Sequence, residues 1–519
     1  MRAVIMAGGF GTRLRPLSIN IPKPMVPVGN LPMMEHVVSL LQQHGLTEIT
    51  SLLYFQPEVI RDYFGDGSRF GVHMTYCLPD DDYGTAGAVR AAITDPDEAV
   101  LVISGDLITD FNLTQAMQWH RDKKAQATIL LTRIENPLAY GIVITDDDGR
   151  IVRFLEKPSW GEAFSDTINT GIYLLEPEAI RQIPEKTNFD FSQNLYPLML
   201  SKGMRLYGKI MEGYWKDVGN VGEYHRVHSD LFAGTLQLDT KTERIATEAY
   251  TLYRGKSVVI DDVKLSGTVI LADDVVVGPG SKLHNVAIGA RVRIGEGCHV
   301  RDTVVWSDTI IGERCRLTGA TVCRRVRISP DVQLLDGAIV SDESAIGAGA
   351  TVKAGCKIWP GKAVDDGAIV STSIVWGEKW NRELFTDSKI TGLALTEMTP
   401  EMCSRLGAAL GAFLGTRARL LTSRDASDVT RLLRRSLLSG LLAAGVDVSD
   451  IEALPAPVLR YGLSHGNYSA GLYCRHNPDD YRLIEFIILD GSGLDMPTAK
   501  LKKIERNYFG EDFERAGMD

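Results

Sequence analysis

The 519-residue sequence lacks a long apolar run. No segment approaches the roughly 20 consecutive apolar residues that a helix needs to cross a bilayer. The N-terminal stretch MRAVIMAGG has too short an apolar core before its glycines to act as a secretory signal, and it is more typical of a buried first strand. The sequence therefore predicts a protein without a membrane partner.

The sequence also lacks paired cysteines. Its seven cysteines are scattered and include no C-x-x-C pair: Cys77, Cys298, Cys315, Cys323, Cys356, Cys403 and Cys474. An odd number without short spacings argues against a disulfide framework or a zinc site. We therefore expect reduced thiols in a cytoplasmic protein.

An excess of positive charge is missing as well, since 56 Lys and Arg face 66 Asp and Glu, a formal charge of −10. Broad nucleic-acid binding needs a basic face that displaces counterions from phosphates, so we expect no nucleic-acid partner. A local basic pocket for a small phosphorylated ligand is compatible with this balance. The length itself predicts two to four domains.

Residues 1–238 alternate short β-rich runs with helical patterns. Strands are expected at residues 4–7, 101–104, 127–132 and 171–175, and helices at residues 33–44 and 113–123. This alternation predicts a Rossmann-like α/β domain with a mainly parallel sheet. Ligands of such sheets bind beyond the carboxyl ends of the strands. The first glycine-rich loop follows the first strand directly and therefore lies at that edge.

Residues 256–383 carry an internal repeat instead of helical periodicity. Two steps of six and one of five between apolar residues make a turn of 17 residues. One inward apolar residue on each of three faces predicts a parallel β-solenoid. The segment resembles the hexapeptide-repeat left-handed parallel β-helix. The expected inward residues are Val277, Leu283, Ile288, Ile294, Val300, Val305, Ile311, Leu317, Val322, Ile328, Leu334, Val340, Ile346, Val352 and Ile358.

Residues 388–519 return to an α/β pattern. Helices are expected at residues 402–413 and 429–444, and a strand at residues 482–489. Asp387-Ser388 and the preceding stretch Asn381-Arg382-Glu383 are a plausible linker. The sequence therefore predicts three domains.

The residues with the clearest chemistry follow the first strand. Ala7, Gly8, Gly9, Gly11 and Thr12 form a glycine-rich turn whose backbone N–H groups can approach phosphate oxygens. Arg13 can donate two hydrogen bonds to a phosphate, and Lys23 adds a compact positive charge. A plain strand–turn–helix junction is the alternative. The run lacks the third glycine of a dinucleotide-binding motif and the Gly-Lys-Ser/Thr ending of a Walker loop.

This run resembles the signature of the sugar-1-phosphate nucleotidyltransferases, and the similarity extends through the whole first segment. The resemblance implies that Arg13, Lys23 and Asp106 are catalytic. It implies a base- and ribose-binding loop at Gly84, Thr85, Ala86 and Gly87. Asp106 and Asp217 would be the ligands of Mg²⁺, a hard cation that binds through one or two carboxylates and substrate phosphates.

The same resemblance assigns a sugar-phosphate site. Lys157 would hold the phosphate of the sugar, and Glu156 and Asn169 would bind its hydroxyls, with Thr170 beside them. Gly141 would leave room for the ring. The implied reaction is in-line: a sugar-1-phosphate oxygen attacks the α-phosphorus of an NTP and pyrophosphate leaves.

The last segment resembles the first domain of phosphohexomutases. Mutases carry a phosphorylated serine directly before His-Asn-Pro, whereas here Arg475 precedes His476. Arginine cannot relay a phosphoryl group, and its fixed charge would bind phosphate instead. The sequence also ends without an Asp-Gly-Asp-Gly-Asp metal loop. We therefore expect no mutase activity.

The three-part arrangement resembles bacterial fusions of a mannose-1-phosphate guanylyltransferase with a phosphomannomutase. It favours GTP and mannose-1-phosphate as substrates, with glucose-1-phosphate uridylyl or thymidylyl transfer as the alternative. The β-helix implies a homo-oligomer or regulation. Acyl transfer, another use of such helices, has only His284 and His299 to rely on in the repeat. A non-catalytic regulatory subunit would have lost Arg13, Lys23, Asp106 or Asp217, and all four are present.

Overall fold

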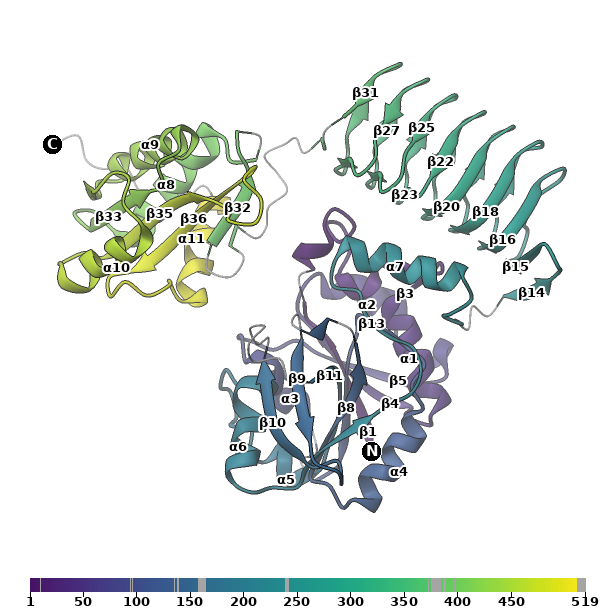
Figure 1. The fold of residues 1–519 in the computed structure, drawn as a ribbon, viewed down its shortest axis with the longest axis horizontal. Coiled ribbons are helices and arrows are strands. Elements are labelled where there is room, and N and C mark those ends of the chain that lie inside the picture. The colour runs from purple at the N-terminus through teal and green to yellow at the C-terminus, as the bar shows by residue number, and fades with distance from the viewer. Residues whose placement is uncertain are drawn as a thin grey trace. The chain divides into compact units, whose positions relative to one another are not determined.

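The computed structural model describes residues 1–9, 11–93, 95, 97–134, 136–137, 140–156, 165–238, 242–371, 373–374, 384–385, 389–395 and 397–510. The chain forms two compact units, Met1–Ile374 and Val375–Asp519 (Figure 1). No helix within the described part is long and apolar enough to cross a membrane.

The first unit begins with a nine-stranded sheet. Its main path runs β10-β9-β11-β6-β1-β4-β5, and β8 joins β11 to β12. Strands β1, β4, β5 and β6 are parallel, as predicted, whereas β9, β10 and β11 run antiparallel to their neighbours. The strands are β1 (Arg2–Ala7), β4 (Glu48–Leu53), β5 (His73–Cys77), β6 (Val100–Ser104), β8 (Ala127–Arg133), β9 (Gly141–Thr145), β10 (Ile151–Glu156), β11 (Thr167–Leu175) and β12 (Leu206–Ile210).

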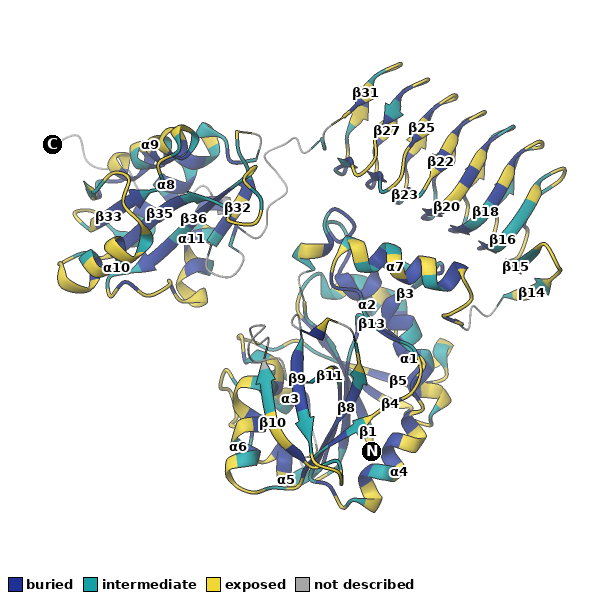
Figure 2. Ribbon diagram, viewed as in Figure 1, coloured by how far each residue is buried: buried dark blue, intermediate teal, exposed yellow. Residues whose placement is uncertain are grey.

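Helices cover both faces of this sheet, and its central strands are buried (Figure 2). Ile5 of β1 packs into one hydrophobic core and Val4 into the other, since neighbouring strand residues point to opposite faces. The predicted helices are confirmed within one residue at each end. The helices are α1 (Met33–Gln43), α2 (Pro57–Phe64), α3 (Gly84–Ala92), α4 (Leu113–Asp122), α5 (Pro177–Ile180), α6 (Tyr196–Ser201) and α7 (Val221–Phe232).

Two small ladders shape the edge of the sheet. Strand β7 (Leu107–Thr109) follows β6 and pairs antiparallel with β13 (Trp215–Asp217). A second ladder joins β2 (Pro27–Val28) to β3 (Leu31–Pro32). Short 3-10 turns span Thr12–Leu14 and Lys23–Met25. These elements carry the glycine-rich loop and the predicted acidic residues.

The predicted β-helix is confirmed, and every predicted inward residue is at most 3 % exposed. Its coils stack by parallel pairing (Figure 1). The turn of 17 residues holds from Lys282 to His299, but later coils need 18 residues, as from Thr321 to Ile339. The turn of 17 therefore does not extend to these later coils, whose predicted inward residues already follow in steps of six, from Val322 through Ile328 and Leu334 to Val340.

The β-helix strands are short, and two strands precede its regular coils. They are β14 (Glu243–Ala246), β15 (Tyr250–Arg254), β16 (Lys264–Leu271), β17 (Val276–Val277), β18 (Lys282–Ile288), β19 (Arg293–Ile294), β20 (His299–Val305), β21 (Ile310–Ile311), β22 (Arg316–Thr318), β23 (Thr321–Val322), β24 (Arg327–Ile328), β25 (Gln333–Leu334), β26 (Ile339–Val340), β27 (Ala345–Ile346), β28 (Thr351–Val352), β29 (Lys357–Ile358), β30 (Ala363–Val364) and β31 (Ile369–Val370).

The second unit is a five-stranded sheet in the order β32-β36-β35-β33-β34. The two predicted helices and the predicted strand are confirmed as α8, α9 and β36. Thr399 caps α8, and Ser427 caps α9 through the backbone N–H of Val429. The elements are β32 (Lys389–Leu393), α8 (Pro400–Leu414), β33 (Arg419–Arg424), α9 (Asp428–Ala443), β34 (Asp447–Asp450), α10 (Ala456–His465), β35 (Ala470–His476), β36 (Leu483–Asp490) and α11 (Thr498–Gly510).

Candidate active site

The glycine-rich loop leaves β1 at Ala7 and turns sharply at Gly11. Gly11 has φ of 64°, and a Cβ there would lie 2.9 Å from the Cβ of Lys23. The hydroxyl of Ser18 donates a hydrogen bond of 2.6 Å to the carbonyl oxygen of Gly11. The turn is therefore fixed against the segment that carries Lys23, and only glycine fits it without strain.

Lys23 lies between the two predicted acidic residues. Its ammonium group forms ion pairs with Asp106 and, at 3.2 Å, with the Oδ1 atom of Asp217. Asp106 follows β6, and the β7–β13 ladder aligns Asp217 with Leu107. The ladder therefore places both carboxylates at the carboxyl end of β6.

Burial makes these charges depend on one another. Burial alone would lower the pKa of Lys23, but the charges of Asp106 and Asp217 outweigh it and raise that pKa. Burial also raises the pKa of Asp217, and the like charge of Asp106 adds to this, against the opposing charges of Lys23 and Arg13. A further positive charge at this point would be stabilised by both carboxylates.

Arg13 is exposed beside this centre. Its Nη2 atom lies 3.6 Å from the position that a Cβ on Gly219 would take, close to Asp217. An exposed guanidinium just beyond the carboxyl end of β1 can bind phosphate oxygens bidentately. The structure thus brings Arg13, Lys23, Asp106 and Asp217 together.

The predicted base-binding residues form the N-terminus of α3. A Cβ on Gly87 would lie 2.4 Å from the carbonyl oxygen of Thr187, and one on Gly84 would lie 2.9 Å from that of Phe189. The backbone N–H groups of Ala86 and Gly87 both donate to the carbonyl oxygen of Phe189. The small residues are therefore required by the packing of the chain itself.

Thr85 projects from the same turn and is exposed. Its hydroxyl donates a hydrogen bond of 2.7 Å to the Oδ2 atom of Asp190 and accepts one from the backbone N–H of Phe191. These bonds hold the start of α3 against the segment around residue 190.

The predicted sugar-phosphate residues lie on β9, β10 and β11. Gly141 begins β9 and pairs with Glu156 at the end of β10, and Lys157 lies outside the described residues. Asn169 on β11 donates to the hydroxyl of Tyr173 at 3.1 Å and accepts from the backbone N–H of Gly171. The hydroxyl of Thr170 is buried and donates to the carbonyl oxygen of Leu130.

Two aromatic residues at this site were not predicted. The indole N–H of Trp215 donates to the carbonyl oxygen of Thr170 at 3.0 Å, and Tyr140 packs edge-on against Trp215. Burial, followed by the charge of Asp217, raises the pKa of Tyr140 to about 12. Tyr140 directly precedes Gly141 and Trp215 lies two residues before Asp217, and this proximity is the signal that could have identified them.

The acidic pair suits a divalent cation that is shared with a substrate. Carboxylate oxygens are the ligands that Mg²⁺ prefers, and Asp106 and Asp217 already converge on one cationic group, Lys23. Within the described ranges, no group of three or more His, Cys, Asp or Glu side chains could hold a metal by itself. Asp106 and Asp217 would therefore hold a divalent cation only together with ligands from a bound substrate.

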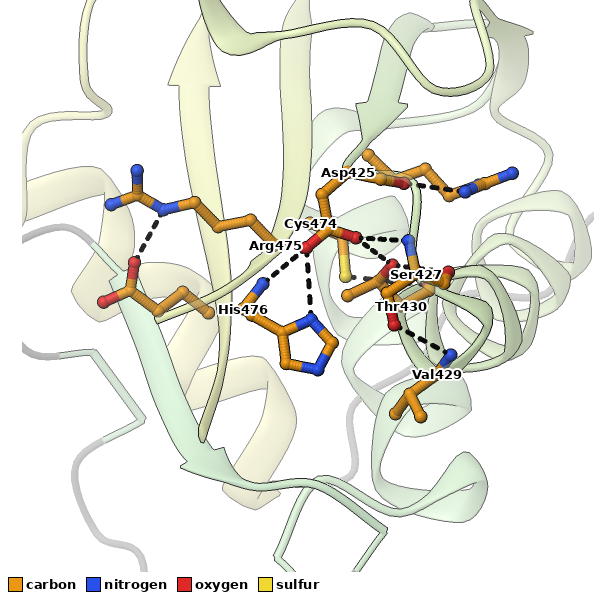
Figure 3. A network of polar contacts seen from close by, with 9 residues as sticks. Asp425, Ser427, Val429, Thr430, Cys474, Arg475 and His476 are labelled. Carbon is orange, nitrogen blue, oxygen red and sulfur yellow. Dashed lines mark hydrogen bonds and ion pairs between the residues drawn. The ribbon is translucent and has the colours of Figure 1, made fainter. Parts of the chain in front are cut away.

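The second unit holds a separate polar network at the ends of β33 and β35 (Figure 3). Asp425 accepts hydrogen bonds from the backbone N–H and the imidazole of His476, at 2.8 and 3.2 Å. Arg475 donates a bond of 2.8 Å to Glu485, which is fully buried and also pairs with Lys389. Arg475, which stands where the mutases have their phosphorylated serine, is thus part of an ion-pair network.

Three family models match successive parts of the chain. The family model described as nucleotidyl transferase matches residues 2–233. The model of the EIF2B subunit epsilon LbH domain matches residues 250–352, and that of phosphoglucomutase/phosphomannomutase alpha/beta/alpha domain I matches residues 382–515. The three predicted fold types are confirmed.

The chain matches several named relatives over most of their length. A UTP–glucose-1-phosphate uridylyltransferase of Synechocystis sp. is 35 % identical over 59 % of this chain and 87 % of its own. A mannose-1-phosphate guanylyltransferase of Mycobacterium tuberculosis is 32 % identical over 57 % of this chain and 82 % of its own. Mannose-1-phosphate guanylyltransferase 1 of Arabidopsis thaliana is 29 % identical over 68 % and 89 %. The chain belongs to the nucleotidyl transferase family, as its sequence predicts.

Proposed function

We propose that this protein transfers a nucleotidyl group from an NTP to a sugar-1-phosphate, and that GTP and mannose-1-phosphate are its substrates. The observation that carries the proposal is the meeting of Arg13 and Lys23 with Asp106 and Asp217 at the carboxyl end of β6. Two cations and two carboxylates suit a reaction in which a triphosphate is bound and pyrophosphate leaves.

The chain's own residues would act by position and charge. Arg13 and Lys23 would bind the phosphates of the NTP and stabilise negative charge on the leaving pyrophosphate. Lys157 would bind the phosphate of the sugar, and Glu156 and Asn169 would orient its hydroxyls. No nucleophilic side chain is required, because an oxygen of the sugar phosphate attacks the α-phosphorus directly.

Asp106 and Asp217 would hold Mg²⁺. The ion would supply charge neutralisation at the phosphates of the bound NTP. Lys23 pairs with both carboxylates, and the exposed Arg13 is available to phosphate. The loop from Ala7 to Thr12 and the start of α3 would enclose the nucleotide, although Gly84 and Gly87 also serve the packing of α3.

The choice of GTP and mannose-1-phosphate is supported by relatives named mannose-1-phosphate guanylyltransferase and by the mutase-like third segment. Uridylyl transfer to glucose-1-phosphate is the second candidate, because a relative with 35 % identity carries that name. A non-catalytic regulatory role is disfavoured, since the chain keeps all four charged residues in one place.

We further propose three domains, at residues 1–238, 256–383 and 388–519, with homo-oligomerisation through the β-helix. A cytoplasmic location is proposed from the seven free thiols.

The experiment measures pyrophosphate release for four NTPs, each combined with mannose-, glucose- or N-acetylglucosamine-1-phosphate. We expect the highest kcat/KM with GTP and mannose-1-phosphate. Release only with UTP or dTTP and glucose-1-phosphate would replace the proposed substrates. No release from any pair would contradict nucleotidyl transfer.

We also expect no mutase activity, because Arg475 cannot carry a phosphoryl group and its guanidinium is paired with Glu485. The measurement is the conversion of mannose-6-phosphate to mannose-1-phosphate by the purified protein. Turnover above the background rate would contradict the expectation.

A further inference from the structure

One face of the β-helix has apolar residues where a solvent-exposed coil would have polar ones. The residues directly before the inward positions on this face are Ile270, Ala287, Val304, Thr321 and Ile339, and all are at most 5 % exposed. Four of the five belong to the same hydrophobic core as Leu14, Leu17 and Ile21. This face of the β-helix and the segment that follows the glycine-rich loop therefore contribute to one hydrophobic core.

Polar contacts fix the register of this packing. The hydroxyl of Ser341, directly after β26, donates a hydrogen bond of 3.2 Å to the carbonyl oxygen of Pro16. The side-chain amide of Asn20 donates to the Oδ2 atom of Asp342 at 3.3 Å. Ser341 and Asp342 are 1 % and 3 % exposed, so these bonds are shielded from water.

A second pair of contacts holds the chain just beyond Lys23. The side-chain amide of Asn30, in the turn between β2 and β3, donates to the carbonyl oxygen of Ile288 at 2.7 Å. The hydroxyl of Tyr224 donates to the carbonyl oxygen of Pro27 and accepts from the indole N–H of Trp306. The β-helix thus contacts the chain on both sides of Lys23.

These contacts lead to the active site by a short path. Ser18 lies between Pro16 and Asn20, which contact the β-helix, and its hydroxyl donates to the carbonyl oxygen of Gly11. The Gly11 turn touches Lys23, and Lys23 is paired with Asp106 and Asp217. A displacement of residues 16–20 would therefore move both predicted phosphate-binding cations.

We propose that Asn20, Ser341 and Asp342 are positioning residues: through them the β-helix holds the glycine-rich loop and Lys23 in the geometry required for nucleotidyl transfer. This inference rests on the proposed function. It gives the β-helix a direct role in the site of the same chain, separate from any assembly of chains. Small displacements of catalytic groups have large effects on rate, because effective concentration depends steeply on alignment.

The test is a reciprocal exchange of the Asn20–Asp342 pair. Asn20→Asp puts a second carboxylate against the buried carboxylate of Asp342, and the repulsion should displace residues 16–20. In the double variant Asn20→Asp/Asp342→Asn the amide and the carboxylate exchange places, which restores a donor and an acceptor between the two positions. The contact of 3.5 Å between the Nη2 atom of Arg324 and the Oδ2 atom of Asp342 is given up in this variant. The amide at position 342 keeps an oxygen to accept from the backbone N–H of Arg324.

The readout is kcat and KM for GTP and mannose-1-phosphate, or for the best pair that the substrate screen identifies. We expect Asn20→Asp to lower kcat about tenfold and to leave the KM of the sugar phosphate within about twofold. The double variant should recover kcat to within about threefold of wild type. A reduction that the exchange does not reverse, or no reduction at all, would overturn the proposal.

Asn285→Asp is the matched control. Asn285 makes the same kind of bond, 3.0 Å to the Oδ1 atom of Asp302, but this bond is exposed and joins two coils of the β-helix to each other. We expect kcat within about twofold of wild type. A loss equal to that of Asn20→Asp would show general disruption of the β-helix and would overturn the positioning role.

Amide hydrogen exchange separates failure of this inference from failure of the proposed function. Asn20→Asp should accelerate exchange in residues 11–25, and the double variant should reverse the change. If wild type releases no pyrophosphate but this exchange pattern is seen, the proposed function fails, while the positioning of residues 11–25 by the β-helix is supported. If wild type is active but Asn20→Asp changes neither hydrogen exchange nor kcat, the positioning role fails and the proposed function is unaffected.

Discussion

Lys23 is 7 % exposed and lies between two carboxylates, so none of the three charges can be changed without affecting the others. Removing Lys23 would leave Asp106 and Asp217 repelling each other at a partly buried site. Removing one carboxylate leaves the ammonium paired with the other. The second change is the milder one for folding and is therefore the more informative test of chemistry.

Asp106→Asn should abolish turnover while the protein stays folded. The amide is neutral and cannot serve as an anionic metal ligand, and the loss should lower kcat by about 10³ or more. Steady-state pyrophosphate release measures the effect, with circular dichroism as the control for folding. Near-normal turnover would remove Asp106 from the catalytic centre.

Gly11→Ala should destabilise the protein by about 2 kcal/mol, whereas Gly9→Ala in the same loop should change stability by less than about 0.5 kcal/mol. Gly11 has φ of 64° and a Cβ there would lie 2.9 Å from the Cβ of Lys23, while a Cβ on Gly9 would meet nothing within 4 Å. Urea denaturation of the two variants measures the difference. Equal stabilities would contradict the described turn.

At the scale of elements, a buried histidine holds helix α7 against the turn between β2 and β3. The Nδ1 atom of His228 bonds the carbonyl oxygen of Tyr224 at 2.9 Å, and its Nε2 atom accepts from the backbone N–H of Gly29 at 3.4 Å. Both contacts are satisfied only by the neutral imidazole, since a protonated Nε2 would face another donor. Burial lowers the pKa of His228 from 6.5 to about 4.

This lowered pKa predicts a loss of stability in acid. The unfolded chain binds the proton near pH 6.5 and the folded chain only near pH 4, so the stabilisation is complete above 6.5 and decreases as the pH falls towards 4. At pH 5 the loss should be about 2 kcal/mol. Urea denaturation at pH 7 and pH 5 should show a smaller difference for His228→Gln than for wild type.

His299→Gln is the control for that measurement, because His299 is exposed on the β-helix. Slight burial and the charges of Lys282 and Arg316 also lower the pKa of His299, so this variant should reduce the pH dependence, but by less than His228→Gln does. The same dependence in His228→Gln as in wild type would mean that His228 is not buried in its neutral form.

The elements also show what a sequence can predict. The inward positions of the β-helix recur at a regular spacing from coil to coil. One sequence pattern therefore predicts all of these positions, and all are buried. The outward residues Ile270, Val304 and Ile339 are equally apolar, but nothing along the chain says which surface covers them. That information exists only once α7 and residues 14–28 have packed on that face.

The candidate site likewise combines residues that a sequence pattern predicts with residues that only the fold brings together. The loop from Gly8 to Lys23 is contiguous, and its chemistry can be inferred from spacing alone. Asp106 and Asp217 are joined by the register of β7 and β13, and no local pattern predicts this pairing. Only resemblance to a family indicated it. At Gly84 and Gly87 the sequence pattern does not distinguish a ligand-binding role from a packing role, because the packing of the chain alone already requires small residues there.

On the scale of the whole molecule, the described residues of the site and the β-helix that braces it belong to the unit Met1–Ile374. We expect a protein ending after residue 374 to keep kcat within about threefold of the full chain, because the two units have separate hydrophobic cores. Parallel assays of pyrophosphate release measure this. Loss of activity in a folded truncated protein would show that the second unit contributes to catalysis.

The central claim is that bond breakage occurs at the α-phosphorus of the NTP. It can be tested by incubating the protein with GTP and mannose-1-phosphate and following the products by ³¹P NMR. The proposed function predicts a sugar nucleotide and pyrophosphate in equal amounts, with neither formed by Asp106→Asn. Formation of GDP and a sugar bisphosphate, or of no phosphorus product with any NTP and sugar-1-phosphate, would contradict it.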